Sequence, residues 1–179
     1  HATHQAPEVA GKAVTWIECC DWLPTILSGR TGLFQIYRSA CAAGHKALWH
    51  SAWGGLPNRS CLAEIHPYLG LIYDSYTSIP KPANQPAGTL CKTWADQLGL
   101  PETVVVGGSS LDAHAGAVGA GIQPGVMVVS LGTSTVNILV ENPENLKGKR
   151  ITHISGQAEN SVLPGMIGLE SSQAAFGDV

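Results

Sequence analysis

The sequence predicts an α/β fold. Of its 179 residues, 44% are apolar and only 13% are charged, a composition typical of a well-packed globular protein rather than a disordered or coiled-coil chain. Two apolar, β-branched runs predict strands at 126–131 and 135–141, and Gly132-Thr133-Ser134 between them predicts a hairpin turn. A run of small residues from Asp112 to Gly121 predicts a closely packed helix just before them.

The first third of the chain is expected to be helical. Apolar residues three or four apart form one stripe over 8–29, which predicts an amphipathic helix. Pro24 either kinks this helix or opens a second one capped by Asp21, and Gly29 suits its end. The other expected elements, in chain order, are an irregular stretch with one short helix at 38–57, short helices within 58–74, an extended proline-rich segment at 79–86, a helix at 88–99, a strand at 104–106, a strand at 151–155 and a turn at 164–165.

Charge and composition exclude several classes of protein. A net charge of −3 without a Lys/Arg run argues against nucleic acid or an anionic membrane as partner, and Lys147, Lys149 and Arg150 are interpreted as a solvated loop. No apolar run approaches the ~20 residues that a membrane-spanning helix needs. The five cysteines are odd in number and lack CxxC spacing, so we expect buried thiols in a reducing, cytoplasmic setting. The ends at His1 and Val179 suggest the interior of a longer protein.

Asp112 is the first candidate catalytic residue. It is an isolated carboxylate at a predicted strand-to-helix corner, surrounded by glycine and alanine. Such a group can remove the proton from a substrate hydroxyl, and it can equally cap the helix that follows it. Both interpretations are compatible, because a residue at a helix start is held rigidly.

The turn Gly132-Thr133-Ser134 is the candidate phosphate-binding site. Backbone N–H groups and hydroxyls of such a turn can point at phosphate oxygens, although the turn can also serve only the hairpin. The sequence contains no GxxxxGK[ST] run, which excludes a P-loop enzyme for this segment. A carboxylate beside such a turn suits phosphoryl transfer.

Lys46, Glu170 and the histidines are the remaining candidate functional residues. Lys46 is a cation among small and apolar residues, and Glu170 is an isolated acid whose alternative role is to cap a following helix. The seven histidines raise a metallohydrolase alternative with His45, His50, Asp112 and His114, but their spacing matches no zinc motif, and no metal-ligating residues are expected.

Four stretches of the chain together resemble the FGGY family of carbohydrate kinases, and within it the L-ribulokinases most. They cover nearly the whole chain in the family's order, and they are 16–24 with Ser28-Gly29; 38–50; 111–121 with 131–135; and 163–170 with 173–178. Two departures accompany the resemblance. The family's first phosphate turn and its adenosine-binding stretch are absent from these residues, so the segment alone is expected to be inactive. Ser171-Ser172 stands where members often carry Ala-Gly.

The resemblance implies an actin-like, ribonuclease H-like fold of two domains, with 1–122 the end of the sugar-binding domain and 123–179 the beginning of the nucleotide-binding domain. It implies MgATP-dependent phosphorylation of the 5-hydroxyl of L-ribulose in arabinose catabolism, with Asp112 as catalytic base. Lys46, Asp112 and Glu170 would bind the sugar, and Gly132, Thr133 and Ser134 would bind ATP. It allows a homodimer. Another pentulose such as D-ribulose or D-xylulose, or a non-catalytic sugar or nucleotide binder, stays open as an alternative.

Overall fold

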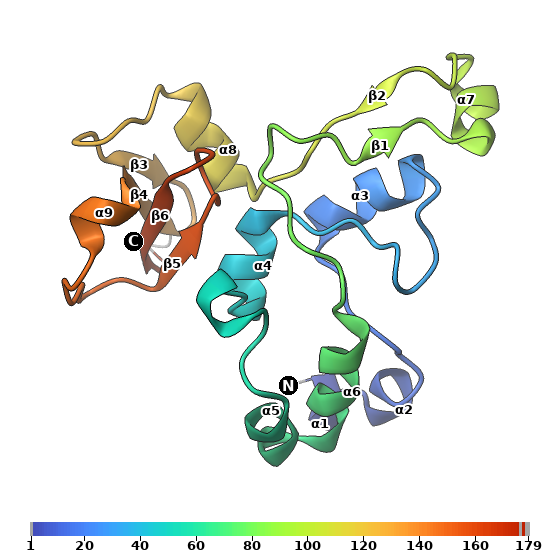
Figure 1. Cartoon of the computed structure of the whole chain (residues 1–179), viewed down its shortest axis with the longest axis horizontal. Coiled ribbons are helices and arrows are strands. Elements are labelled where there is room, and N and C mark those ends of the chain that lie inside the picture. Colours follow the sequence, from blue (N-terminus) through green and yellow to red (C-terminus); the bar gives the residue numbers. More distant parts are fainter. Residues whose placement is uncertain (1, 176, 178–179) are drawn as a thin grey trace.

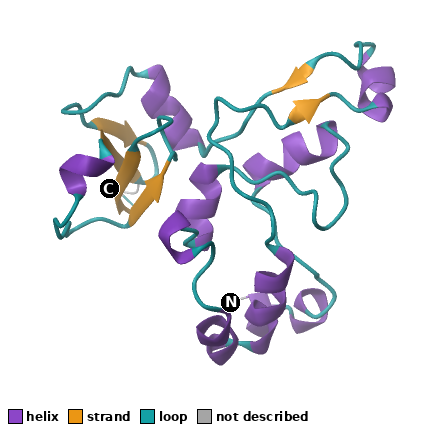
Figure 2. Ribbon diagram, viewed as in Figure 1, coloured by secondary structure: helices purple, strands orange, loops and turns teal. Residues whose placement is uncertain are grey.

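The structure, a computed structural model, describes residues 2–175 and 177. Helices and two antiparallel sheets alternate along the chain, so the chain is of mixed α and β structure, as predicted (Figures 1 and 2). The helices are α1 (Ala2–Gln5), α2 (Pro7–Ala10), α3 (Cys19–Leu27), α4 (Ala40–Ala47), η1 (Ser51–Trp53), α5 (Arg59–Ile65), α6 (Pro67–Ser75), α7 (Lys92–Leu98), α8 (Asp112–Gly119) and α9 (Pro143–Leu146). The strands are β1 (Gly88–Thr89), β2 (Val105–Val106), β3 (Val128–Leu131), β4 (Thr135–Glu141), β5 (Gly156–Glu159) and β6 (Ile167–Gln173).

The larger sheet has the order β3-β4-β6-β5, and all of its neighbouring strands are antiparallel. The predicted hairpin is confirmed, with Leu131 opposite Thr135 at its turn. Helix α8 packs against β3 and β4 (Figure 1). The contact contains a cluster of buried apolar side chains that includes Ala117, Ile138 and Val140. This core crosses the predicted domain boundary near 121–125, and the division into two domains stays a prediction.

Two predictions about the end of the chain are wrong. The strand expected at 151–155 lies instead at 156–159, where glycine begins it although glycine disfavours strands. Glu170 lies inside strand β6 and not ahead of a helix, so it caps none. Of the segment 173–178 named in the resemblance, Phe176 and Asp178 lie outside the described residues.

The predicted helix over 8–29 is interrupted. Helix α2 ends at Ala10 and α3 begins at Cys19, with Glu18 in the N-cap position. Pro24 lies inside α3, so it does not open a second helix and Asp21 does not cap one. The hydroxyl of Thr25 donates to the carbonyl of Asp21 at 2.7 Å. Gly29, at φ 69°, follows the end of the helix as expected.

Asp21 joins three segments that are far apart in the sequence. Its side chain is only 1% exposed, and Oδ2 accepts a hydrogen bond from the N–H of Ser39, the residue that caps α4. Oδ1 accepts from the hydroxyl of Ser109 at 2.7 Å, and the N–H of Ser109 donates to the hydroxyl of Tyr37. The loop that leads into α8 is therefore anchored to α3 and to the start of α4.

The cysteines differ from the expectation of buried thiols. Cys41 is buried, whereas Cys19 and Cys61 are exposed. All five are free thiols. In the described part of the chain, no helix has the length and apolar character that crossing a bilayer requires.

Candidate active site

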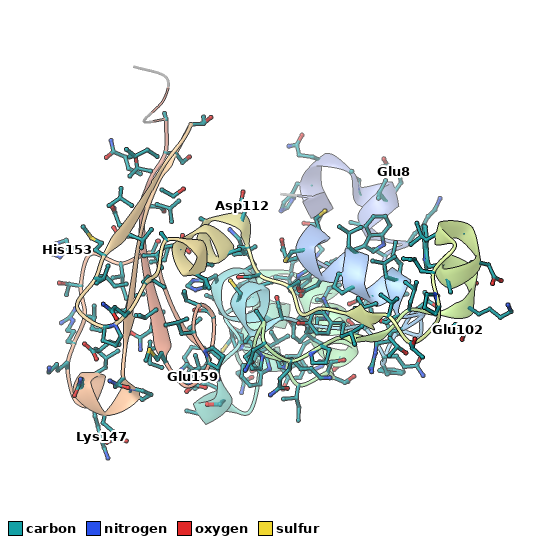
Figure 3. All side chains as sticks on the ribbon, turned by 90° about the horizontal axis from the view of Figure 1, so that it is seen from above. Glu8, Glu102, Asp112, Lys147, His153 and Glu159 are labelled. Atoms are coloured by element: carbon teal, nitrogen blue, oxygen red, sulfur yellow. The ribbon has the colours of Figure 1, made fainter. Side chains whose placement is uncertain are left out.

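Asp112 is the first residue of α8 and is exposed to solvent. Its side chain points outward from the helix (Figure 3). Leu111 takes the N-cap position, so the capping interpretation of Asp112 is wrong by one residue. Oδ1 accepts a hydrogen bond from the N–H of Ala113 at 2.8 Å. The positive end of the helix dipole favours a negative charge at this position.

The turn Gly132-Thr133-Ser134 is exposed at the tip of the β3–β4 hairpin. The N–H of Gly132 donates to the carbonyl of Ser134 at 3.0 Å, which tightens the turn. The carbonyl of Thr133 accepts from the N–H of Gly177 at 3.0 Å. The turn therefore presents two side-chain hydroxyls to solvent on a short, internally bonded loop.

Asp112 and this turn line the same cavity. Its volume is about 620 Å³, within the ~300–1,000 Å³ of small-molecule sites. One wall is the exposed side of α8, and the other is formed by β3, the turn and the beginning of β4. The two motifs singled out from the sequence thus face one space, with the carboxylate at one side and the hydroxyl-bearing turn at the other.

Lys46 and Glu170 do not line this cavity. Lys46 lies exposed in the last turn of α4, and Glu170 lies in the middle of β6 with its side chain 17% exposed. Both are close enough to His114 for their charges to act on its pKa, as does the charge of Asp112. Of the three residues predicted to bind a sugar, only Glu170 is in direct contact with His114, at 3.5 Å.

Glu170 lies between two buried histidines that the sequence did not connect with it. Its Oε2 is 3.4 Å from Nδ1 of His45 and 3.5 Å from Nε2 of His114, and the two imidazole rings are 4.5 Å apart between centroids. Both histidine side chains are only 2% exposed. Burial lowers the pKa of His45 to about 3, helped by the nearby His114 and Lys46. Burial also lowers the pKa of His114, although Glu170 opposes the shift.

The four-residue metal set considered from the sequence is not assembled. Among the described residues, His45, His114 and Glu170 have potential ligand atoms within 4.8 Å of one another, and this group lacks both His50 and Asp112. His50 lies elsewhere, with Nε2 3.8 Å from Glu159 and Nδ1 accepting from the N–H of Ala52. The sequence holds one signal for the group of His45, His114 and Glu170, because each histidine lies close to a predicted site residue. His45 directly precedes Lys46, and His114 lies two residues after Asp112.

Comparison with known proteins decides the relationship. The chain is 42% identical over 177 residues to a ribulokinase of Vibrio parahaemolyticus and 30% identical over 178 residues to a ribulokinase of Geobacillus thermodenitrificans. The chain is homologous to a segment of ribulokinase. These alignments cover 99% and 98% of the chain but only 31% and 30% of the two ribulokinases. The resemblance read from the motifs is confirmed. No family model matches the chain.

Solved structures agree on the fold of this ribulokinase-like segment. A xylulose kinase from Rhodospirillum rubrum superposes with a TM-score of 0.69 at 20% identity, covering 99% of the chain and 33% of the kinase. A second kinase, from Brucella ovis and described as a xyloylose kinase, gives a TM-score of 0.68 at 18% identity, covering 99% of the chain and 34% of that protein. The segment therefore has part of the sugar-kinase fold, and it spans about a third of the length of the proteins it matches.

Proposed function

We propose that this chain is part of an ATP-dependent pentulose kinase that phosphorylates the 5-hydroxyl of L-ribulose. The single observation that carries the proposal is the shared cavity, in which Asp112 faces the turn Gly132-Thr133-Ser134. In this proposal residues 1–122 end the sugar-binding domain and residues 123–179 begin the nucleotide-binding domain. The ribulokinase homologues supply the substrate class, which the geometry alone does not specify.

Asp112 acts as general base. Its carboxylate is exposed at the cavity, and the hydrogen bond from Ala113 holds one oxygen, so the other can accept the proton of a sugar hydroxyl. As that proton leaves, the hydroxyl oxygen attacks the γ-phosphoryl group, and ADP departs. Phosphoryl transfer has a loose transition state, so alignment of the two reactants and stabilisation of charge supply most of the catalysis.

The turn binds the phosphates of ATP. Thr133 and Ser134 offer hydroxyl donors, and Gly132 has no side chain to keep a phosphate oxygen away from the backbone. The polar groups at this cavity, the carboxylate of Asp112 and the hydroxyls, are oxygen donors, which suits Mg²⁺ held mainly by ATP phosphates. When bound there, Mg²⁺ would neutralise charge on the phosphates.

Lys46 and Glu170 bind the sugar in this proposal. A lysine donates hydrogen bonds and a carboxylate accepts them, so together they recognise hydroxyl groups from two sides. A site that hydrogen-bonds the hydroxyls of its substrate discriminates against analogues that lack them. Glu170 contacts His45, and Lys46 is the next residue of the same helix, α4.

The test is a substrate panel with the whole protein that contains these residues. MgATP is combined with L-ribulose, D-ribulose, D-xylulose or glycerol, and ADP release is followed by a coupled assay. We expect the highest kcat/KM for L-ribulose. A higher kcat/KM for another pentulose would change the proposed substrate but leave the proposed phosphoryl transfer in place. A protein that binds sugar and ATP in calorimetry but never releases ADP would be a non-catalytic binder.

The variant Asp112→Asn tests the mechanism. Loss of the general base should lower kcat by ~10²–10⁴-fold. Asp96→Asn is the matched control, because Asp96 is an exposed carboxylate on α7 that is ion-paired with Lys92. Circular dichroism should show both variants folded. An Asp112→Asn enzyme as active as Asp96→Asn would remove Asp112 from the role of base.

A further inference from the structure

The sheet leaves a space beside Glu170 that His45 occupies. Glu170 of β6 is paired with Gly156 of β5 and with Ile138 of β4. A Cβ atom at Gly156 would collide with Nδ1 of His45, the same atom that lies 3.4 Å from the Glu170 carboxylate. The glycine at the start of β5, unfavourable for a strand, therefore makes room for this contact.

The approach of α4 to the sheet also depends on glycine. A Cβ atom at Gly44 would collide with Cβ of Ala158 on β5. Figure 1 shows α4 beside β5. His114 lies on α8. Two helices and a strand thus bring His45, His114 and Glu170 together, each from a different element.

The electrostatics of the cluster define what the histidines can do. At neutral pH both rings are neutral, because their pKa values are lowered mainly by burial, so each ring carries one N–H donor and one acceptor. Burying a carboxylate is costly unless hydrogen bonds satisfy it. Within the described residues, the two imidazoles are the only basic groups in ion-pair contact with the Glu170 carboxylate.

The contacts are not yet good hydrogen bonds. They measure 3.4 and 3.5 Å, longer than the usual 2.7–3.2 Å, and none of the four imidazole nitrogens has a hydrogen-bond partner in the described part of the chain. Such contacts often tighten when a substrate binds. Both histidine side chains are only 2% exposed, whereas the side chain of Glu170 is 17% exposed and so is the more accessible of the three to a ligand.

We propose that His45 and His114 are positioning residues of the sugar site. Each donates its N–H to Oε2 of Glu170, and this pair of donors, the histidine clamp, holds the carboxylate so that Oε1 accepts a hydroxyl of the pentulose. The inference rests on the proposed function, and it assigns these two buried residues a part in sugar specificity. Because His114 lies two residues after Asp112 in α8, the clamp also links the sugar-binding acid to the helix that carries the base.

Paired substitutions test the clamp in the whole protein. His45→Leu and His114→Leu remove the donor and keep an apolar side chain of similar bulk. His45→Asn and His114→Gln restore an amide N–H near the position of Nδ1 and Nε2, respectively. We expect each leucine variant to raise the KM for the pentulose about ten- to hundredfold, the loss expected for a hydrogen bond to a charged group, with little change in kcat or in the KM for ATP. The amide variants should recover most of the affinity.

The outcomes separate the clamp from other roles. An active enzyme whose leucine variants keep the parent KM for the sugar, or whose amide variants are as impaired as the leucine variants, overturns the clamp alone. No sugar-dependent ADP release from the parent overturns the proposed function and the clamp with it. Two imidazoles and a carboxylate are also a donor set for zinc. Stoichiometric zinc in the purified parent, lost in His114→Leu, would overturn the clamp in favour of a metal site.

Discussion

Replacing Asp21 by alanine should destabilise the protein strongly. The carboxylate is 1% exposed and accepts hydrogen bonds from the N–H of Ser39 and the hydroxyl of Ser109 at 3.1 and 2.7 Å. A hydrogen bond to a charged group is worth roughly 1.5–3 kcal/mol, and the substitution also leaves the buried N–H of Ser39 without its acceptor. We therefore expect a loss of about 3–5 kcal/mol in the free energy of unfolding.

Urea unfolding followed by circular dichroism measures this loss. The matched control is Asp74→Ala, because Asp74 also binds two donors, both from Arg59, but is 51% exposed. Exposed ion pairs contribute little, so this variant should unfold close to the parent. If Asp21→Ala cost no more than Asp74→Ala, burial of the Asp21 network would not be what holds the three segments together.

Two further predictions concern the contact between α4 and the sheet. His45 has a folded pKa of about 3, below its ordinary 6.5, and the pKa of His114 is lowered too. The unfolded chain therefore binds more protons below pH 6.5, so the free energy of unfolding should fall as the pH drops from about 6.5 toward 3. His45→Gln should flatten this pH dependence, measured by urea titrations at several pH values. An unchanged pH dependence in the variant would contradict the prediction. Gly44→Ala should lower the melting temperature because its Cβ meets Ala158, whereas Gly119→Ala, which faces open space in α8, should not; equal melting temperatures would refute this close approach.

Local patterns were sufficient for the elements that line the cavity. The hairpin of β3 and β4 follows from two β-branched runs around a glycine turn, and the helix at Asp112 follows from a run of small residues. Each signal lies within a few neighbouring residues, so it is readable without tertiary information. The catalytic candidates on these elements were therefore placed correctly in the fold, although their roles stay predictions.

The contacts that were missed join distant parts of the chain. Asp21 looked like a helix cap, but its partners are 18 and 88 residues away, and no local pattern contains them. Glu170 looked like a cap as well, yet it pairs with histidines from two separate helices. Strand β5 was misplaced because Gly156 carries a poor strand propensity that tertiary packing overrides.

The shared core of α8 and the hairpin strands has a mechanical consequence. Ala117 of α8 and Ile138 of β4 are both fully buried in one apolar cluster. Because close-packed side chains leave little room for relative movement, we expect α8 and the β3–β4 hairpin to move as one rigid unit. The separation between the carboxylate at position 112 and the bend at 132–134 is then fixed by folding. Any movement that admits substrates or releases products has to occur between other elements of the protein.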